Sequence, residues 1–159
     1  MSENMRLFSK EDLIISCDKK TYPEVLEYAA DYLEKKGYVK DTFKEAILKR
    51  EEEFPTGLGI EDSDFDVAIP HTFPEHVIIP GVLVIKMENP VSAIQMGTFE
   101  DVVSNIRYIF MLLLEGKSDS HLVMLQTLMG FFQNKEAMET LGKANTPDEI
   151  YAALEKHFK

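Results

Sequence analysis

The sequence contains one cysteine, no long apolar run and comparatively few basic residues, and each scarcity excludes a class of protein. Because Cys17 is the only cysteine in 159 residues, no internal disulfide can form, which favours a reducing compartment. The longest apolar run, Tyr108 to Leu114, is far shorter than the ~20 residues that a membrane-spanning helix needs. Residues 1–10 are polar and lack the apolar segment of a secretory signal. We therefore expect a cytoplasmic protein without direct membrane insertion.

Acidic residues outnumber basic ones by 28 to 17, which gives a net charge of -11. Nucleic acid is disfavoured as a partner, because binding to it requires lysine and arginine against the phosphates. The acidity either favours partners with a basic docking face or only keeps the protein in solution, and the sequence leaves both open.

The hydrophobic pattern predicts a single domain over residues 1–159, with helices and strands alternating along the chain. Its class is α/β, with a central mixed β-sheet covered by helices on both faces. Strands are expected at residues 13–17, where Cys17 would be a buried structural thiol, and at residues 65–69, 77–87 and 106–114.

Three Thr-x-x-Glu capping boxes predict helix starts, at Thr21, Thr42 and Thr146. The first helix should end at Gly37, and the second near Glu52, before the turn at residues 55–59. A further helix is expected at residues 120–132, with a core stripe of Leu122, Leu125, Leu128, Met129 and Phe132.

The sequence has no phosphate-binding P-loop, no nucleophile elbow and no zinc-type Cys/His spacing, so the four histidines are the candidates for chemistry. His71 follows Asp66-Val67-Ala68-Ile69-Pro70, so a buried strand delivers it to the edge of the sheet and Pro70 ends the pairing. A neutral imidazole held there would be a good nucleophile. The local sequence is equally compatible with an ordinary loop histidine.

Two other residues could bind an anion. His121 lies at the expected start of a helix, where backbone N–H groups attract anions, or it is a capping or solvated residue. Arg50 ends the second helix beside a turn, where its guanidinium could bind phosphate or only complement the helix dipole. His76 and His157 have no supporting pattern and are expected to be surface residues.

Three segments together resemble one family. Residues 50–58, Arg-Glu-Glu-Glu-Phe-Pro-Thr-Gly-Leu, precede Ala68-Ile69-Pro70-His71, and Ser120-His121-Leu122 begins a helix. This combination resembles the IIA components of the sugar phosphotransferase system, in the fructose/mannitol superfamily, over roughly residues 7–158. The Glu-Phe-Pro-Thr-Gly segment resembles the galactitol branch, although Thr72 replaces the small residue, often glycine, that follows the histidine in many members.

The resemblance implies a phosphoryl carrier. His71 would take phosphate on Nε2 from phospho-HPr, with Nδ1–H held by a backbone carbonyl, and pass it to a cysteine of a IIB component. His121 and Arg50 would stabilise the phosphoryl group, no metal or other cofactor would be needed, and the membrane IIC component would be served indirectly. The surface that meets HPr is expected to include Phe73, Pro74, Leu58, Glu61, Asp62 and Asp64.

Two other functions remain open at this point. The protein could be a regulatory module in which phosphorylation of His71 switches its binding to a transporter or transcription factor. It could also be a metal-dependent hydrolase that uses His71 and His121, although a third ligand at the usual spacing is missing.

Overall fold

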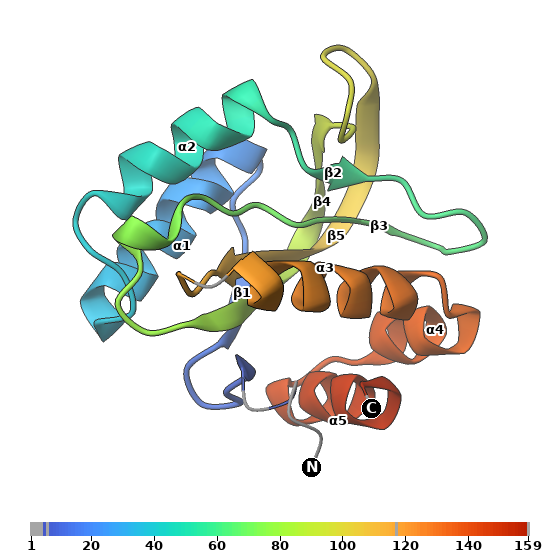
Figure 1. Ribbon diagram of the computed structural model, residues 1–159. Helices are drawn as coiled ribbons and strands as arrows, with labels where there is room; N and C mark the ends of the chain where they lie inside the picture. Colours follow the sequence, from blue (N-terminus) through green and yellow to red (C-terminus); the bar gives the residue numbers. More distant parts are fainter. Residues whose placement is uncertain (1–4, 6, 117, 159) are drawn as a thin grey trace.

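Five strands form one mixed sheet in the computed structural model (Figure 1). The structure describes residue 5, residues 7–116 and residues 118–158; within the last range, residues 118–121 are described by their backbone alone. The order of the strands is β1-β4-β5-β3-β2. β1 runs parallel to β4 and β3 parallel to β5, whereas the β4–β5 and β2–β3 pairs are antiparallel. The bounds are β1 Ile14–Cys17, β2 Gly57–Leu58, β3 Asp66–Ala68, β4 Gly81–Ile94 and β5 Val102–Leu113.

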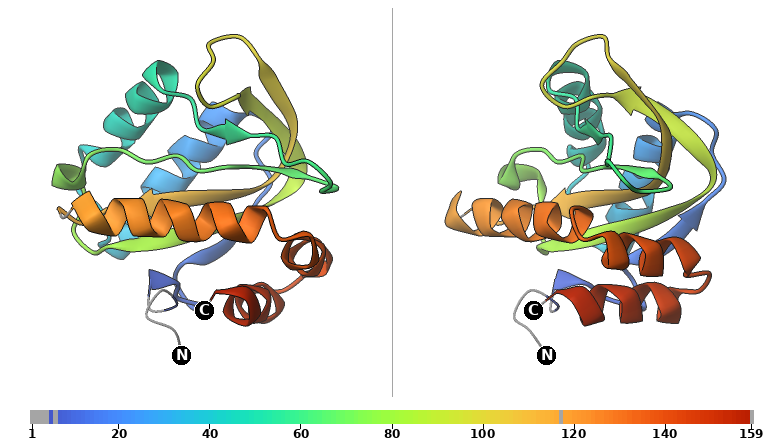
Figure 2. Two further views of the ribbon diagram at one scale, coloured as in Figure 1. Left: turned by 45° about the vertical axis from the view of Figure 1, so that its right-hand side comes forward. Right: turned by 90° about the vertical axis from the view of Figure 1, so that its right-hand side faces the viewer.

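Helices cover both faces of this sheet, as Figure 1 and the turned views of Figure 2 show. One face carries α1 (Tyr22–Lys36) and α2 (Phe43–Glu53), and the other carries α3 (Ser118–Phe132), α4 (Lys135–Lys143) and α5 (Pro147–His157). Val82 and Val84 point into one core, and Leu83 and Ile85 into the other, because side chains alternate along a strand. The predicted α/β class and two-sided helical cover are confirmed.

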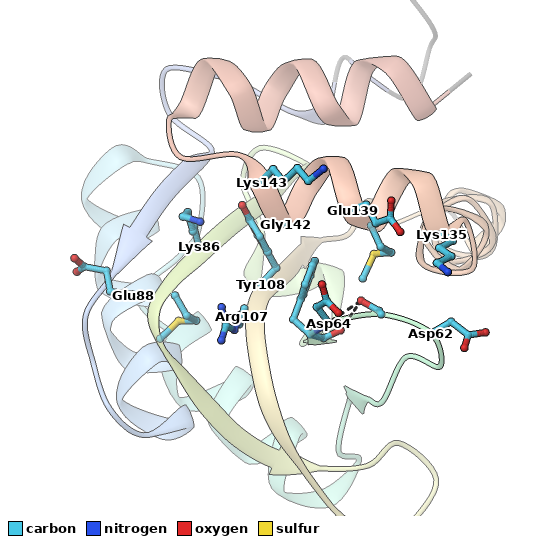
Figure 3. Close-up of a pocket in the computed structure, with 14 residues that line it drawn as sticks. Asp62, Asp64, Lys86, Glu88, Arg107, Tyr108, Lys135, Glu139, Gly142 and Lys143 are labelled. Atoms are coloured by element: carbon cyan, nitrogen blue, oxygen red, sulfur yellow. Dashed lines mark hydrogen bonds between the residues drawn. The ribbon is translucent and has the colours of Figure 1, made fainter.

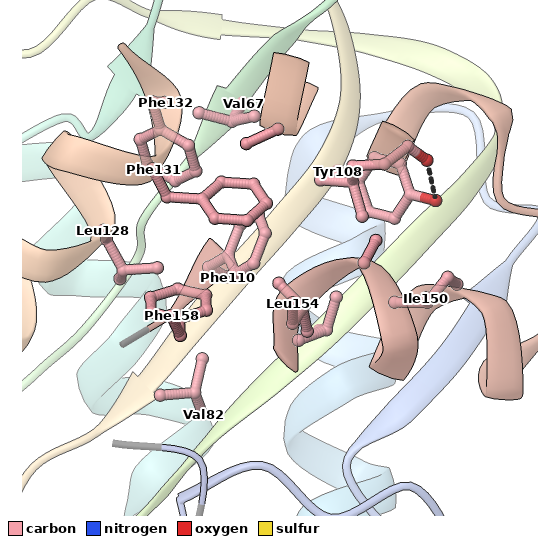
Figure 4. Packing of buried hydrophobic residues seen from close by; sticks show 14 of the residues in the cluster. Val67, Val82, Tyr108, Phe110, Leu128, Phe131, Phe132, Ile150, Leu154 and Phe158 are labelled. Carbon is pink, nitrogen blue, oxygen red and sulfur yellow. Dashed lines mark hydrogen bonds between the residues drawn. The ribbon is translucent and has the colours of Figure 1, made fainter. Parts of the chain in front are cut away.

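Aromatic rings dominate the core beneath α3 and α5 (Figure 4). Phe110 of β5 meets Phe132 edge-on with 5.3 Å between ring centres, and Phe131 stacks on Phe158 at 5.0 Å. Each buried ring of this kind stabilises the fold by about 1.5–3 kcal/mol relative to an exposed one. The core therefore holds β5 firmly, and β5 is the strand beside which the candidate histidine lies.

Two of the three predicted helix caps are confirmed. The side chains of Thr21 and Thr146 accept hydrogen bonds from the backbone N–H groups of Glu24 and Glu149, and Gly37 ends α1 with a φ of 85°, which favours glycine. The helix start predicted at Thr42 is confirmed, because α2 begins at Phe43, but the Thr42 hydroxyl makes no cap and instead hydrogen-bonds Nδ1 of His76 at 2.8 Å.

Several element boundaries differ from the prediction. β4 begins at Gly81 rather than residue 77 and continues past Pro90 to Ile94, because a register shift between Lys86 and Val91 accommodates the proline. The strand β2 and the short helix α4 were not predicted. Leu122, placed in the core stripe of α3, is 56% exposed. Within the described residues, no helix combines the length and apolar character needed to cross a membrane.

Candidate functional site

His71 lies directly after β3, where the chain still follows β5. Leu112 of β5 donates its backbone N–H to the carbonyl of Pro70 at 3.0 Å, and His71 forms a parallel bridge with Leu112. Ile69, only 1% exposed, donates its N–H to the carbonyl of Thr56 at 3.1 Å. The backbone that carries the half-buried His71 is thus fixed from both sides.

The imidazole of His71 is oriented by its own backbone. Its Nδ1 lies 2.8 Å from the carbonyl oxygen of Ile69, and because a carbonyl only accepts hydrogen bonds, Nδ1 is the protonated nitrogen. In the neutral ring, Nε2 then carries the lone pair. The predicted contact of Nδ1 with a backbone carbonyl is confirmed.

Arg50 lies in the last turn of α2, and aromatic rings hold its side chain. Its guanidinium carbon is 4.0 Å from the ring centre of Phe54 and 5.1 Å from that of Phe73. An aromatic ring face attracts the cation. The N–H groups of the guanidinium lie in the plane of the guanidinium itself, so they stay available to an anion. Of the two roles that the sequence leaves open for Arg50, these contacts favour anion binding over a helix-dipole role alone.

Arg50 and His71 meet at the same surface. They line one hollow of about 360 Å³, whose other walls include Phe54, Met96 and Phe99. They also line a second of about 180 Å³ with Phe73, Leu112 and Leu125. The structure therefore brings together two of the three predicted site residues, in surroundings that are mostly apolar.

His121, the third predicted residue, belongs to α3, but its side chain lies outside the described part of the structure. Its helix borders the site, because Leu125, which lies one turn further along α3, lines the smaller hollow with His71.

The half-buried carboxylate of Glu51 connects α1, α2 and the turn before β2. Glu51 accepts hydrogen bonds from the hydroxyl of Tyr22 at 2.7 Å, from the backbone N–H of Thr56 at 2.6 Å and from the hydroxyl of Thr56. Burial raises the pKa of Glu51, and the hydrogen bonds from Thr56 and Tyr22 oppose that rise. Burial also raises the pKa of Tyr22 well above its ordinary value.

The tip of the β4–β5 hairpin forms another wall of the site. Met96 donates its backbone N–H to the carbonyl of Gly57 at 2.8 Å. The backbones approach so closely that a side-chain carbon at Gly57 would lie 2.6 Å from the carbonyl oxygen of Ile94, which explains the glycine. Phe99, at the tip, is 82% exposed.

The other two histidines do not join the site. His76 bonds Thr42, as described above. His157 was expected at the surface, but its ring packs edge-on against Phe131 and its Nε2 is buried without a hydrogen-bond partner in the described part of the chain. Among the described residues, no group of three or more His, Cys, Asp or Glu side chains could hold a metal ion.

A larger hollow, of about 830 Å³, lies elsewhere, between the β2–β3 loop, β4, β5 and α4 (Figure 3). Asp62 and Asp64 line it rather than the hollows of His71. Leu58 is buried in the core. The prediction of a partner surface is therefore wrong for Leu58, which a partner cannot reach, whereas Phe73 and Pro74 lie beside His71. For Glu61, Asp62 and Asp64 the partner surface stays a prediction.

Sequence reasoning missed the roles of Glu51 and Tyr22, and of the hairpin tip at residues 96–99. Tyr22 and Glu51 are 29 residues apart, and no motif spacing links them. The sequence predicts that the Phe-Pro-Thr-Gly turn ends the helix, and the polar Thr56 within that turn is its one signal of a hydrogen-bond network. In the structure Thr56 is 5% exposed, and a buried polar group needs hydrogen-bond partners.

Comparison with known sequences gives two results. Residues 6–157 match the family model described as "Phosphoenolpyruvate-dependent sugar phosphotransferase system, EIIA 2". The chain is 31% identical over 118 residues to the galactitol-specific EIIA component of Escherichia coli (strain K12), which covers 74% of this chain and 75% of the relative. It is 26% identical over 157 residues to the fructose-specific EIIABC component of Bacillus subtilis (strain 168), covering 96% of this chain and 23% of that longer protein.

Solved structures agree on the fold. Enzyme IIAMTL, in its complex with phosphorylated enzyme IIBMTL from Escherichia coli, superposes with a TM-score of 0.70 at 23% identity, over 91% of this chain and 95% of that one. The nitrogen regulatory protein IIA-Ntr from Neisseria meningitidis gives 0.73 at 23% identity, over 96% and 99%. With nearly its whole length matched by the family model, the chain belongs to the EIIA 2 family of the phosphoenolpyruvate-dependent sugar phosphotransferase system, whose members are phosphoryl carriers.

Proposed function

We propose that His71 is the residue that carries the phosphoryl group, taking it from phospho-HPr and passing it to a cysteine of a IIB component. The observation that carries this proposal is the 2.8 Å contact of Nδ1 with the carbonyl of Ile69. It leaves Nε2 as the nucleophilic nitrogen, on a ring that lines a hollow shared with an arginine.

The transfer needs no cofactor. The Nε2 lone pair of His71 forms a bond to phosphorus while the bond between phosphorus and the donor histidine of HPr breaks, and the bonding electrons return to that donor ring. Nδ1 keeps its proton throughout. The reverse roles apply in the second step, where the thiolate of the IIB cysteine attacks phosphorus and the Nε2–P bond breaks. The protein contributes mainly positioning and charge stabilisation.

Arg50 is the best-placed cation for this role. Its contacts with the rings of Phe54 and Phe73 hold the guanidinium at the hollows that His71 also lines, and it has no carboxylate contact within 4 Å in the described part of the chain. We assign His121 a second stabilising role, because its helix borders the same hollow. Tight binding of phosphohistidine would slow onward transfer, so both residues should act chiefly on the transition state.

Exposed apolar side chains around His71 form a surface suited to protein partners. Phe54, Phe73 and Phe99 are 54%, 55% and 82% exposed, and Met96 lines the same hollow as Phe54 and Phe99. Aromatic residues and methionine are enriched where proteins bind each other. HPr and IIB would use this surface in turn, and the net charge of -11 favours partners with basic faces.

The sugar is proposed from the relatives. The 31% identity to a galactitol-specific EIIA component and the Glu-Phe-Pro-Thr-Gly turn favour galactitol or a related hexitol over fructose and mannitol. A regulatory function is the alternative, favoured by the structural likeness to a nitrogen regulatory protein. The two differ in one step: a regulator retains its phosphate, whereas a transport component delivers it to a IIB cysteine.

The experiment incubates the purified protein with phosphoenolpyruvate, enzyme I and HPr. We expect one acid-labile, base-stable phosphate per chain, lost in His71→Gln and retained in His76→Gln, the matched control from the same loop. Labelling that persists in His71→Gln would contradict the proposal. Adding the galactitol-type IIB should then remove the phosphate within the time of sugar uptake, and its retention would favour the regulator.

A further inference from the structure

The half-buried carboxylate of Glu51 has no role in the transfer steps, yet it begins a continuous path of hydrogen bonds to His71. Its Oε2 accepts the backbone N–H of Thr56 at 2.6 Å, and its Oε1 accepts the hydroxyls of Tyr22 and Thr56. Three donors on one carboxylate leave it little freedom to turn. Thr56, itself 5% exposed, is therefore fixed at both its N–H and its side chain.

The path continues through two backbone carbonyls. The backbone carbonyl of Thr56 accepts a hydrogen bond from the N–H of Ile69 at 3.1 Å, and the backbone carbonyl of Ile69 accepts one from Nδ1–H of His71 at 2.8 Å. The Ile69 side chain is buried in the core, so this residue cannot rotate to compensate for a displaced Thr56. Any movement of the turn at Thr56 is thus transmitted to the carbonyl that holds the imidazole.

We infer that Glu51 is a positioning residue of the phosphorylation site, which fixes the Nδ1–H tautomer of His71 through Thr56 and Ile69. Even partial removal of a carboxylate from water costs free energy, which its hydrogen bonds must offset. A half-buried acid that ties α1, α2 and the Thr56 turn to the reactive ring is better explained by control of geometry than by stability.

Two substitutions of Glu51 separate the effect of side-chain length from the effect of charge. Glu51→Asp keeps the charge, but it is one methylene too short to hold the N–H of Thr56. Glu51→Gln loses the charge but keeps the reach: its amide oxygen can accept from Thr56 N–H, and its NH₂ can donate to the two hydroxyls, which also accept. Glu52→Asp makes the same shortening at the neighbouring exposed position and is the matched control.

The first readout is the ¹⁵N spectrum of His71 in the unphosphorylated protein, which reports the tautomer directly. We expect the Nδ1–H form to predominate in the wild type, Glu51→Gln and Glu52→Asp, and the Nε2–H form to increase in Glu51→Asp. The second readout is the rate of phosphorylation by phospho-HPr, which should fall about tenfold in Glu51→Asp, the effect of one ordinary hydrogen bond. Chemical denaturation of each variant shows whether the fold is intact.

A merely structural Glu51 would lower stability in Glu51→Asp and leave the tautomer unchanged, which would overturn the inference. A tautomer that changes in Glu51→Gln but not in Glu51→Asp would overturn it as well, because charge rather than reach would then act. The inference rests on the proposed function only for the rate. If the wild type takes no phosphate from HPr, the proposed function fails, while the tautomer comparison still decides the role of Glu51.

Discussion

The molecule has two contrasting hollows, and the larger one is not the candidate site. The hollow of about 830 Å³ beside α4 is lined by equal numbers of acidic and basic side chains: Asp62, Asp64, Glu88, Glu139, Lys86, Arg107, Lys135 and Lys143. The hollow of about 360 Å³ at His71 is lined by one arginine, one acidic residue, Glu53, and otherwise largely apolar residues. Acidic and basic groups balance in both hollows, but the single arginine of the second lies in largely apolar surroundings, which strengthen a charge interaction.

The polar groups of the larger hollow also serve the fold. The ammonium group of Lys86 donates a hydrogen bond to the backbone carbonyl of Ala144 at 2.9 Å, and the hydroxyl of Tyr108 donates one to the backbone carbonyl of Leu141 at 3.1 Å. Both bonds tie the sheet to the end of α4. The comparison teaches that orientation and surroundings, rather than volume or number of charges, distinguish a reactive site from a structural one in this protein.

The sharpest way to break this comparison is to remove one arginine from each hollow. Arg50→Ala should slow phosphorylation by phospho-HPr about 10- to 100-fold, because hydrogen bonds to a charged group contribute about 1.5–3 kcal/mol. Arg107→Ala, the matched control in the larger hollow, should leave the rate unchanged. Rapid-quench kinetics would measure both, and an equal loss in the two variants would remove the distinction.

A smaller effect is expected from the aromatic wall. Phe73→Ala removes a ring that stacks on Arg50 and an exposed apolar contact, so KM for phospho-HPr should rise about tenfold, within the range of interface aromatic residues. Ile79→Ala, at a position 45% exposed and outside both hollows, is the control. Steady-state kinetics with varied phospho-HPr would test it, and an unchanged KM in Phe73→Ala would exclude this surface from docking.

The smallest expected change concerns the larger hollow. Tyr108→Phe removes the hydrogen bond to Leu141 and should lower the free energy of unfolding by about 0.5–1.5 kcal/mol, with no change in phosphorylation rate. Urea denaturation and the kinetic assay would measure the two quantities. A slower transfer in this variant would show that the two hollows are coupled, contrary to the account.

Local patterns were sufficient to predict most elements but not all boundaries. The caps at Thr21 and Thr146 were read correctly, since a capping box uses only neighbouring residues. The Thr42 box predicted the start of α2 correctly, but its cap hydrogen bond is absent because the hydroxyl bonds His76, a distant residue in the sequence. The strand predicted at residues 77–87 stops too early, because a local irregularity in the β4–β5 pairing lets β4 continue past Pro90 to Ile94.

The site shows the same division. The strand before His71 predicted a fixed, accessible imidazole, and the family resemblance paired it with Arg50. The stacking of Arg50 on Phe54 and Phe73 and the bond between Tyr22 and Glu51 depend on how α1, α2 and the turn pack together. Packing of this kind leaves no periodic signal in one sequence, so these contacts required the structure.

The most direct test of the central claim is to identify the atom that carries the phosphate. The wild-type protein, labelled with ¹⁵N-histidine and phosphorylated by phospho-HPr, would be studied by NMR through the coupling between phosphorus and the ring nitrogens. The account predicts a phosphoryl group on Nε2 of His71, with Nδ1 still protonated. A phosphoryl group on Nδ1 of His71, or on another histidine, would contradict it.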